Sequence, residues 1–511
     1  MSGAAAGGRV TLVSFYPGFF GLNLRQISAC LREAGFEVDV LHLGYATWRR
    51  GSRAPSLVAF PEPAALLAQL LPRLEGSRYV GISLTASEFG PARAFSDELR
   101  RRSDLPVVWG GPHPTAAAEL CAPHADWICV GEGEHAAVEL AHRLGNGDPT
   151  DDVPNLARLE KGRLVRNPPA PLVEDLDRLP LFDTRLYDQH VYLEGRLERL
   201  TPELLEDLDR IYLRPVPERV IYITSLTRGC PHRCTYCNNS YLRRIYEGQR
   251  YFRRRSLDHL FAEIRRAVED IGIIGAVFLA DDNITALPKR ELRAFAERWV
   301  DEVGLPFGTS GSPTTVTEEK VGILARTGLL YKFGLGVESA SERTLRRYRR
   351  HHGANKIRQA VEAIEAHRSH FYAEHRRPLI NYQFLFDNPY ESADDVRTTL
   401  KFIAGLPERD SVTAFHLVVY PGSELYRQAE RDGLLGDDEG IWQETYVDLD
   451  ATLVKFWLAL FRRGAPRLLL RLLAWRPVFA LFDRPLFRRL YRRLLPEYAP
   501  RPATGHQGGA G

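Results

Sequence analysis

Short runs of β-branched and other apolar residues alternate with amphipathic stretches over residues 10 to 147. The apolar runs begin at Val10, Val38, Tyr79, Val107 and Trp127, and they have the composition of buried parallel strands. The stretches 22–34 and 91–102 carry apolar residues at helical spacing. Strands that alternate with such helices predict a doubly wound α/β sheet, which binds its ligands at the carboxyl ends of the strands.

A second alternation of the same kind begins at Val220. Strand-like runs lie near 220–226, 276–280, 306–309, 331–337, 380–386 and 412–419, and helical patterns lie near 256–271, 288–303, 317–327, 354–369 and 392–404. Six β/α units predict a partial or full barrel whose chemistry lies at the carboxyl-terminal mouth of its strands. Residues 148–218 are rich in Pro, Asp and Leu and are interpreted as a connector, with a hairpin around 156–165 and a short helix near 203–209.

The pattern predicts four segments in total: an α/β domain over 1–147, the connector over 148–218, a barrel over 219–435, and a helical extension with a disordered end over 436–511. Basic residues outnumber acidic residues by eleven to one between Lys455 and Arg493. In 484–495, apolar residues recur at helical spacing while arginines take the opposite face. Two interpretations stay open, a helix on an anionic membrane surface and a helical cap that packs on the barrel with a solvated arginine rim.

Composition excludes several classes of protein. In 511 residues, 44% are hydrophobic and 26% are charged, which is typical of globular chains and unlike disordered or collagen-like ones. The net charge of +3 does not indicate a nucleic-acid partner, and we interpret the basic stretch Arg243–Arg255 as a solvated link rather than an RNA-binding segment. Because the first residues have no signal-peptide pattern and no window holds about 18 uninterrupted apolar residues, we expect a cytoplasmic protein, with peripheral membrane contact left open.

Three of the six cysteines lie within eight residues, Cys230, Cys234 and Cys237, directly after the first strand of the second alternation. Three thiolates at the spacing CxxxCxxC can each bind one iron of a cubane cluster, and the missing fourth ligand leaves one iron open to a substrate or cofactor. A zinc site completed by His232 is the alternative, but structural zinc sites usually pair two such units and the chain has one. Cys30, Cys121 and Cys129 are expected to be small core residues.

With Tyr236 as its aromatic residue, this cysteine loop resembles the hallmark of the radical SAM superfamily. The resemblance implies that Cys230, Cys234 and Cys237 hold a [4Fe-4S] cluster and that its open iron binds S-adenosylmethionine (SAM). It further implies contacts to SAM by five residues: Tyr236, Asp281, Asp282, Glu338 and Ser339. Asp281 and Asp282 have an alternative role, because Asp residues at the end of a strand also cap the helix that follows. Glu338 favours the functional role, because its carboxylate would be costly to bury in an apolar strand without a partner.

One loop departs from the family pattern. Where relatives commonly have GxPGET after the fifth strand, this chain has the residues DNPYES from Asp387. Either this loop has a different shape, or Asp387 and Tyr390 face a particular substrate.

The loops GGPHPT from Gly110 and VGEGE from Val130 resemble the cobalamin-binding, Rossmann-like domain of B12-dependent radical SAM proteins, so that the resemblance spans residues 10 to about 435. The DxHxxG signature that supplies a histidine to cobalt is absent, and the resemblance places Tyr16 and Phe19 against the lower face of cobalamin instead. The other cobalamin contacts that it implies are Ser83, Thr85, Gly110, Gly111, Gly131 and Glu132, with His113 as a wall of the pocket.

The resemblance implies an enzyme that cleaves SAM reductively and, with cobalamin, methylates an unactivated carbon of a small molecule; a lipid and a natural product both fit. An external electron donor such as flavodoxin or ferredoxin is implied, and no catalytic acid or base is identified. Cyclisation, rearrangement or oxidation with the same cofactors is the alternative, and a non-catalytic metal-binding protein is a third hypothesis. The mass of the product and the release of 5′-deoxyadenosine from SAM distinguish these three.

Overall fold

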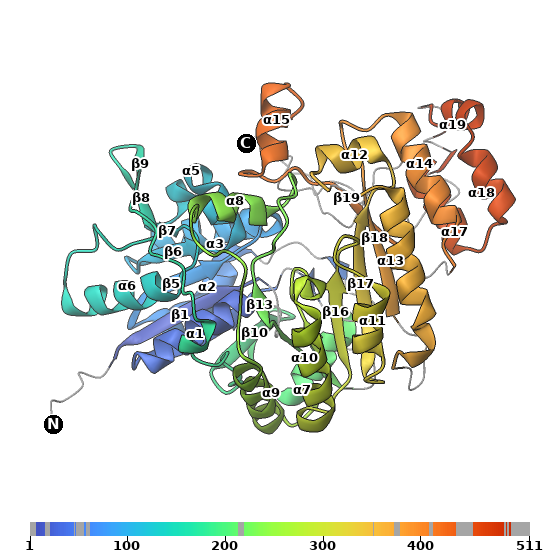
Figure 1. Cartoon of the computed structure of the whole chain (residues 1–511). Helices are drawn as coiled ribbons and strands as arrows, with labels where there is room; N and C mark the ends of the chain where they lie inside the picture. Colours follow the sequence, from blue (N-terminus) through green and yellow to red (C-terminus); the bar gives the residue numbers. More distant parts are fainter. Residues whose placement is uncertain are drawn as a thin grey trace.

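The computed structural model describes residues 7–15, 21–44, 46–47, 56–57, 62–212, 219–350, 352–372, 379–407, 412–435, 453–484, 487 and 490–491. Two large sheets with their covering helices lie side by side, the first in blue and teal and the second in green to orange (Figure 1). The alternation in the sequence thus corresponds to two separate α/β units.

The first sheet contains the five strands expected from the apolar runs, all parallel, in the order β2-β1-β5-β6-β7. Strand order reverses between β1 and β5, and open α/β sheets bind ligands at such a switch point. The strands are β1 (Arg9–Ser14), β2 (Glu37–His42), β5 (Ser77–Ser83), β6 (Val107–Gly110) and β7 (Trp127–Cys129), and the helices are α1 (Leu22–Glu33), α2 (Pro63–Leu74), α3 (Phe89–Arg102), α4 (Pro112–Ala116), α5 (Ala118–Cys121) and α6 (Glu134–Asn146). A separate short pair, β3 (Ala46–Thr47) and β4 (Ser56–Leu57), is antiparallel.

Residues 148–212 do more than connect the two sheets. The expected hairpin, β8 (Leu156–Glu160) and β9 (Arg163–Arg166), pairs with β7, and a second hairpin, β10 (Gln189–Leu193) and β11 (Arg196–Arg199), pairs with β2. Both edges of the first sheet are extended in this way to nine strands. Edge strands leave a row of backbone groups unpaired, and the two hairpins satisfy them. The expected short helix is α7 (Pro202–Tyr212).

The second sheet has six parallel strands in sequential order and forms an open half-barrel. Its strands are β12 (Val220–Thr224), β15 (Ile274–Leu279), β16 (Phe307–Gly311), β17 (Leu330–Glu338), β18 (Leu379–Phe386) and β19 (Val412–His416). The helices are α8 (Asn238–Ile245), α9 (Leu257–Ile271), α10 (Lys289–Glu302), α11 (Glu318–Ala325), α12 (Glu342–Arg347), α13 (Ala354–Ala366), α14 (Ala393–Ala404) and α15 (Glu424–Arg431), and a short hairpin pairs β13 (Thr227–Arg228) with β14 (Arg253–Arg254).

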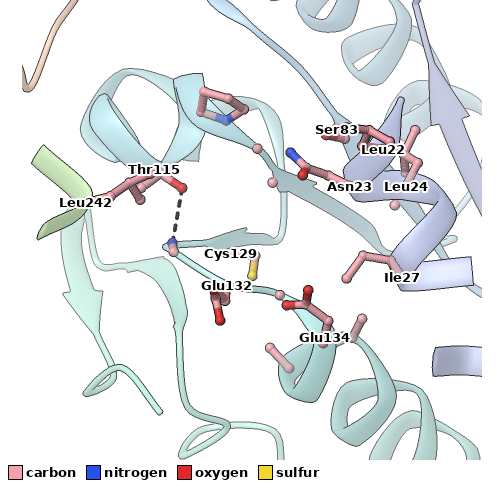
Figure 2. A pocket seen from close by; sticks show the side chains of 18 of the residues that line it. Leu22, Asn23, Leu24, Ile27, Ser83, Thr115, Cys129, Glu132, Glu134 and Leu242 are labelled. Carbon is pink, nitrogen blue, oxygen red and sulfur yellow. Dashed lines mark hydrogen bonds between the residues drawn. The ribbon is translucent and has the colours of Figure 1, made fainter. Parts of the chain in front are cut away.

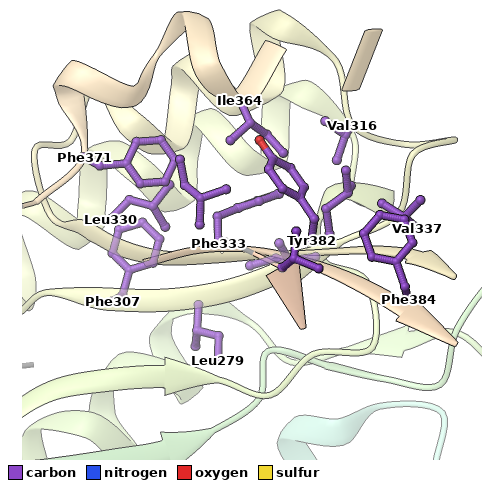
Figure 3. Packing of buried hydrophobic residues seen from close by; sticks show 14 of the residues in the cluster. Leu279, Phe307, Val316, Leu330, Phe333, Val337, Ile364, Phe371, Tyr382 and Phe384 are labelled. Atoms are coloured by element: carbon purple, nitrogen blue, oxygen red, sulfur yellow. The ribbon is translucent and has the colours of Figure 1, made fainter. Parts of the chain in front are cut away.

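The core of the half-barrel lies between the sheet and its helices, where Phe307, Phe333, Tyr382 and Phe384 pack beside aliphatic side chains (Figure 3). Side-chain caps fix where the helices begin. Ser256 Oγ accepts a hydrogen bond from His259 N at 3.1 Å at the start of α9, and Thr317, Ser341, Ser392 and Ser423 cap α11, α12, α14 and α15 in the same way.

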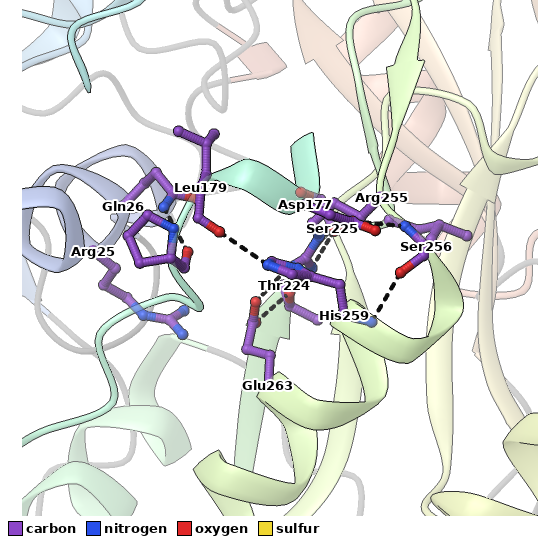
Figure 4. Close-up of polar contacts among 12 residues, drawn as sticks. Arg25, Gln26, Asp177, Leu179, Thr224, Ser225, Arg255, Ser256, His259 and Glu263 are labelled. Carbon is purple, nitrogen blue, oxygen red and sulfur yellow. Dashed lines mark hydrogen bonds and ion pairs between the residues drawn. The ribbon is translucent and has the colours of Figure 1, made fainter. Parts of the chain in front are cut away.

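A buried polar network joins the two sheets. Arg25 of α1 donates from Nη1 to Ile223 O at 2.7 Å, and its guanidinium lies 4.6 Å from the centre of the Tyr222 ring. Tyr222 donates to the fully buried Glu263. Glu263 in turn pairs with Arg255 (Figure 4). Because every charge in this network has a partner, it fixes the position of the first sheet on the half-barrel without an unpaired buried ion.

The C-terminal helices α17 (Leu453–Arg462), α18 (Arg467–Leu473) and α19 (Arg476–Phe482) pack beside α14 (Figure 1). Trp457 Nε1 donates to Leu470 O at 2.8 Å and ties α17 to α18. The amphipathic pattern expected over 484–495 falls mostly outside the described residues. No described helix combines the length and the apolar character that a membrane span requires.

Candidate active site between the two sheets

A cavity lies at the carboxyl ends of β1, β5, β6 and β7, with about 1430 Å³ of empty space that is partly open to solvent. Leu12 and Ser83 line it from either side of the switch point, and Leu22, Asn23 and Ile27 line it from α1 (Figure 2). The half-barrel supplies the opposite wall, with Ser225, Arg228, Gly229, Asn239, Leu242, Tyr246, Tyr251 and Arg253. The cavity is therefore shared between the two α/β units.

A glycine allows the closest contact in this wall. Gly131 has φ +91°, and a Cβ atom there would lie 2.1 Å from Tyr246 Oη. The Tyr246 hydroxyl accepts a hydrogen bond from Glu132 N at 2.7 Å, so the loop after β7 rests directly on the end of α8. A larger residue at position 131 would force the two units apart.

The predicted cobalamin contacts fall into three groups by their position relative to the cavity. Ser83, Gly110, Gly111, Gly131 and Glu132 line the cavity. Thr85 and His113 lie away from the lining, in contrast to the expectation: Thr85 caps a turn by pairing with Glu88, and His113 is 3% exposed and packs edge-on against the Phe89 ring. Tyr16 and Phe19 lie outside the described residues.

Charged side chains join the two walls of the cavity. Arg228 Nη1 lies 2.6 Å from Glu134 Oε1, at the first residue of α6. Arg253 Nη1 donates to Glu132 Oε2 at 3.1 Å, and the Arg253 side chain is 1% exposed. The stretch Arg243–Arg255 is consequently not the solvated link that the sequence suggested, since Arg253 and Arg255 are both buried in ion pairs with carboxylates from other elements.

The cysteine loop follows the first strand of the half-barrel, at the mouth. Cys234 is 7% exposed and Cys230 and Cys237 are half-buried. Burial raises the pKa of the Cys230 thiol to about 11 and that of Cys237 to about 12, so a bound cation is needed to hold them as thiolates at neutral pH. Within the described part of the chain, no three His, Cys, Asp or Glu side chains converge on one point as a single metal ion requires.

His232 anchors the cysteine loop instead of completing a zinc site. Its Nε2 lies 3.0 Å from Asn283 Nδ2 and 3.2 Å from Thr314 Oγ1, which follow β15 and β16. On the other side, Thr235 Oγ1 donates to Arg347 O at 2.9 Å, at the end of α12. The loop is thus held from both sides of the barrel mouth.

Glu338 and Tyr236, two of the expected SAM contacts, meet through a residue that the sequence did not indicate. Arg350 donates from Nη2 to Glu338 Oε1 at 3.1 Å and from Nε to Tyr236 Oη at 3.0 Å. Glu338 ends β17 with φ +69°, a strained value for a residue other than glycine, and strain of this kind gathers at functional sites. Burial raises the pKa of Glu338, and the Arg350 guanidinium opposes that shift. Arg350 is thus the partner without which burying Glu338 would be costly.

The other three expected SAM contacts differ from one another. Asp281 is buried and accepts hydrogen bonds from Leu226 N and Thr227 N at 3.2 and 2.6 Å, so it braces the chain that leads into the cysteine loop. Ser339 is fully buried and shares a 3.1 Å hydrogen bond with Thr399. Asp282 remains exposed. Of this group, Asp282 has a carboxylate that is open to a ligand.

Side-chain contacts hold the loop that departs from the family pattern. Asp387 has φ +60°, and its Oδ2 lies 2.9 Å from His416 Nδ1 at the end of the neighbouring strand. Tyr390 is partly buried: its hydroxyl donates to Asp432 at 2.7 Å, and the Arg347 guanidinium lies 4.1 Å from its ring centre.

These residues fit the two groups that the resemblance implies. Three free cysteines at the spacing CxxxCxxC on one loop suit three irons of a cubane cluster. The cavity suits a large ligand because glycines line the loops after β6 and β7, where they allow close approach to the backbone. No histidine is found among its described lining residues, in keeping with the missing DxHxxG signature.

Comparison with known proteins agrees with both units. The model of the radical SAM superfamily matches residues 224–402, and that of the B12 binding domain matches residues 8–141. An uncharacterized methyltransferase of Pyrococcus horikoshii is 27% identical over 361 residues, 70% of each chain. Cytidylyl-2-hydroxyethylphosphonate methyltransferase of Streptomyces wedmorensis is 23% identical over 462 residues, 84% of this chain and 81% of that protein.

Two solved structures share the fold. The radical SAM methyltransferase TsrM from Kitasatospora setae, with cobalamin and a [4Fe-4S] cluster bound, has a TM-score of 0.59 at 18% identity. The match covers 83% of this chain and 75% of the TsrM chain. The cobalamin-dependent SAM radical enzyme OxsB has a TM-score of 0.64 at 16% identity, and the match covers 96% of this chain and 75% of the OxsB chain. The two family models thus place a B12 binding domain ahead of a radical SAM domain in this chain, and the two solved structures have the same fold.

Proposed function

We propose that the protein is a cobalamin-dependent radical SAM methyltransferase that adds a methyl group to an unactivated carbon of a small molecule. One observation carries this proposal: the cavity of the first sheet is lined by Gly229 and Asn239, which flank the cysteine loop, as well as by Gly110 and Gly131 of the B12-binding domain. A ligand in this cavity lies directly beside the cysteine loop, as transfer between two cofactors requires.

Different residues of the site would bind the cluster, SAM and cobalamin. We assign Cys230, Cys234 and Cys237 to the cluster, Tyr236, Asp282 and Glu338 to SAM, and Ser83, Gly110, Gly111, Gly131 and Glu132 to cobalamin. When bound, the cluster supplies the electron that cleaves SAM, and cobalamin supplies the methyl group. The pairs Arg228–Glu134 and Arg253–Glu132 hold the two walls of the cavity together at the boundary between the units.

A cyclisation or oxidation with the same cofactors is the second candidate. The anaerobic magnesium-protoporphyrin IX monomethyl ester cyclase of Synechocystis is 28% identical over 280 residues, which is 53% of this chain. The two methyltransferases above match 70% and 84% of the chain, and this wider match favours methylation. An electron donor such as flavodoxin or ferredoxin belongs to either proposal.

The test uses the full chain, reconstituted anaerobically with iron, sulfide and hydroxocobalamin, and supplied with SAM, dithionite and pools of small-molecule extract. We expect 5′-deoxyadenosine and S-adenosylhomocysteine from the wild type and neither from Cys234→Ala. A product heavier than its precursor by one methylene supports methylation. A product that has lost hydrogen or gained oxygen, without S-adenosylhomocysteine, would overturn it in favour of the second candidate.

A further inference from the structure

Large apolar side chains are exposed on the C-terminal helices, far from the cavity. Leu468 is 80% exposed, Trp475 55% and Leu472 49%. Of the thirteen exposed large hydrophobic residues in the described part of the chain, six lie in this one stretch: Leu468, Leu469, Leu472, Trp475, Leu481 and Leu490. Single exposed leucines are ordinary, whereas a gathering of this kind marks an interaction surface.

Helix α18 is apolar on two opposite sides. Leu470 and Leu473 are buried in the core of the half-barrel, while Leu468 and Leu472, one turn apart, face away from it. A helix that only capped the barrel would present a polar outer face to water. Packing on α14 therefore accounts for the inner side of α18 and leaves the outer side unexplained.

Arginines border the exposed leucines. Arg471 is exposed on α18, and Arg476 begins α19 with its side chain 78% exposed. Arg467 turns back to the half-barrel, where its Nη2 donates to Leu406 O at 2.9 Å. Between residues 453 and 484 there are seven basic residues and one acid, Asp483. No ion pair to Arg471 is found among the described residues, and the pair of Arg476 with Asp394 is at 4.0 Å. The surface is thus both apolar and strongly cationic.

We propose that α18 and α19 rest on a membrane surface that contains anionic lipids. The leucines and Trp475 enter the boundary between headgroups and acyl chains, and the arginines remain at the level of the lipid phosphates. A second copy of this chain is disfavoured as the occupant, because a symmetric contact would place arginine against arginine. In Figure 1 these helices lie on the side of the half-barrel away from the first sheet, so membrane contact leaves the cavity between the units uncovered.

The test is co-sedimentation of the full chain with vesicles of phosphatidylcholine, with and without phosphatidylglycerol. We expect binding to the anionic vesicles and little to the neutral ones. Leu468→Gln with Leu472→Gln should lower the partition coefficient at least about tenfold, because two side chains lose their apolar burial. Arg471→Gln with Arg476→Gln should lower it about tenfold as well, and added salt should reproduce that loss.

The matched control is Val268→Gln with Val300→Gln, which changes two side chains on α9 and α10 that are 37% and 45% exposed. This variant should bind as the wild type does, and all three should keep the wild-type iron content and thermal midpoint, because every altered side chain is exposed. Absence of binding to anionic vesicles, or an equal loss in the control, would overturn the proposal. A dimer in light scattering that Leu468→Gln with Leu472→Gln converts to a monomer, without vesicle binding, would assign the surface to a second copy instead.

Discussion

Arg228 and Glu134 form an ion pair across the boundary between the two α/β units, with 2.6 Å between Nη1 and Oε1. Arg228 stands two residues before Cys230, and Glu134 is the first residue of α6. The pair therefore connects the start of the cysteine loop with a helix of the B12-binding domain. Both side chains are mostly buried, so little solvent screens the attraction between them.

We expect Arg228→Gln to weaken the retention of cobalamin, because Glu134 would then face the cavity without its partner. Removing one member of a mostly buried pair costs about 3 kcal/mol or more, roughly a hundredfold in affinity if the loss falls on the bound state. Equilibrium dialysis against hydroxocobalamin measures this loss. Arg166→Gln, which removes an exposed pair with Glu119, is the control, and equal losses in both variants would contradict the role of Arg228.

Replacing Cys230, Cys234 or Cys237 singly with alanine should abolish the cluster, since we assign each cysteine as the sole protein ligand of one iron. Iron and sulfide analysis after anaerobic reconstitution should fall from about four per chain to near zero. Cys121→Ala is the control: this cysteine is fully buried beside the first sheet, and its loss should leave the iron content unchanged. Iron retained by any of the three loop variants would count against the ligand assignment.

Replacing Arg350 with methionine should destabilise the half-barrel by about 3 to 5 kcal/mol, because Glu338 would remain as a buried carboxylate without a partner. The double variant Arg350→Met with Glu338→Gln should recover much of this loss, since no charge is then left unpaired. Thermal unfolding of the wild type, Arg350→Met, Glu338→Gln and the double variant gives the coupling energy between the two side chains. Arg349→Met removes an exposed pair with Glu424 and should cost at most about 1 kcal/mol; a similar cost at both positions would show that Arg350 acts through packing alone.

Alanine at Gly131 should separate the two units, because its Cβ atom would meet Tyr246 Oη. We expect faster hydrogen exchange in α8 and weaker cobalamin binding. Gly147→Ala serves as the control, since Gly147 also has a positive φ, +76°, but no atom lies within 4 Å of the Cβ position. That variant should show only the backbone strain of about 1 kcal/mol, and wild-type exchange in α8 of Gly131→Ala would contradict the contact.

We expect Glu88 to make the stability of the first unit depend on pH. The side chain is 1% exposed, and burial raises its pKa from 4.5 to about 7. Because the folded state then holds the proton more tightly than the unfolded state, the stabilising effect is complete below about pH 4.5 and is lost as pH rises to about 7, by about 3 kcal/mol in all. Hydrogen exchange of α3 amides, compared between wild type and Glu88→Gln at each pH, should show this dependence in the wild type and not in the variant.

Much of the fold could be predicted from the sequence, because the spacing of apolar residues that predicts a strand or a helix lies within one short segment of the chain. Every strand expected from an apolar run, from Val10 to the run near 412, is a strand in the structure, since buried parallel strands need continuous apolar residues. The hairpin around 156–165 was expected as well, but its place was not. The sheet to which a hairpin adds is decided by which edge has unpaired backbone groups, and that is a property of the assembled sheet.

The site residues also divide into those that the sequence predicts and those that only the tertiary structure brings together. The spacing of Cys230, Cys234 and Cys237 by itself predicts a cluster-binding loop, because ligands on one short loop carry their geometry in the sequence. Tertiary structure alone decided that Arg350 holds Glu338, that Arg228 holds Glu134, and that Ser339 turns into the core. Such partners come together through the register of parallel strands and the docking of two sheets, and neither leaves a period or a spacing in the chain.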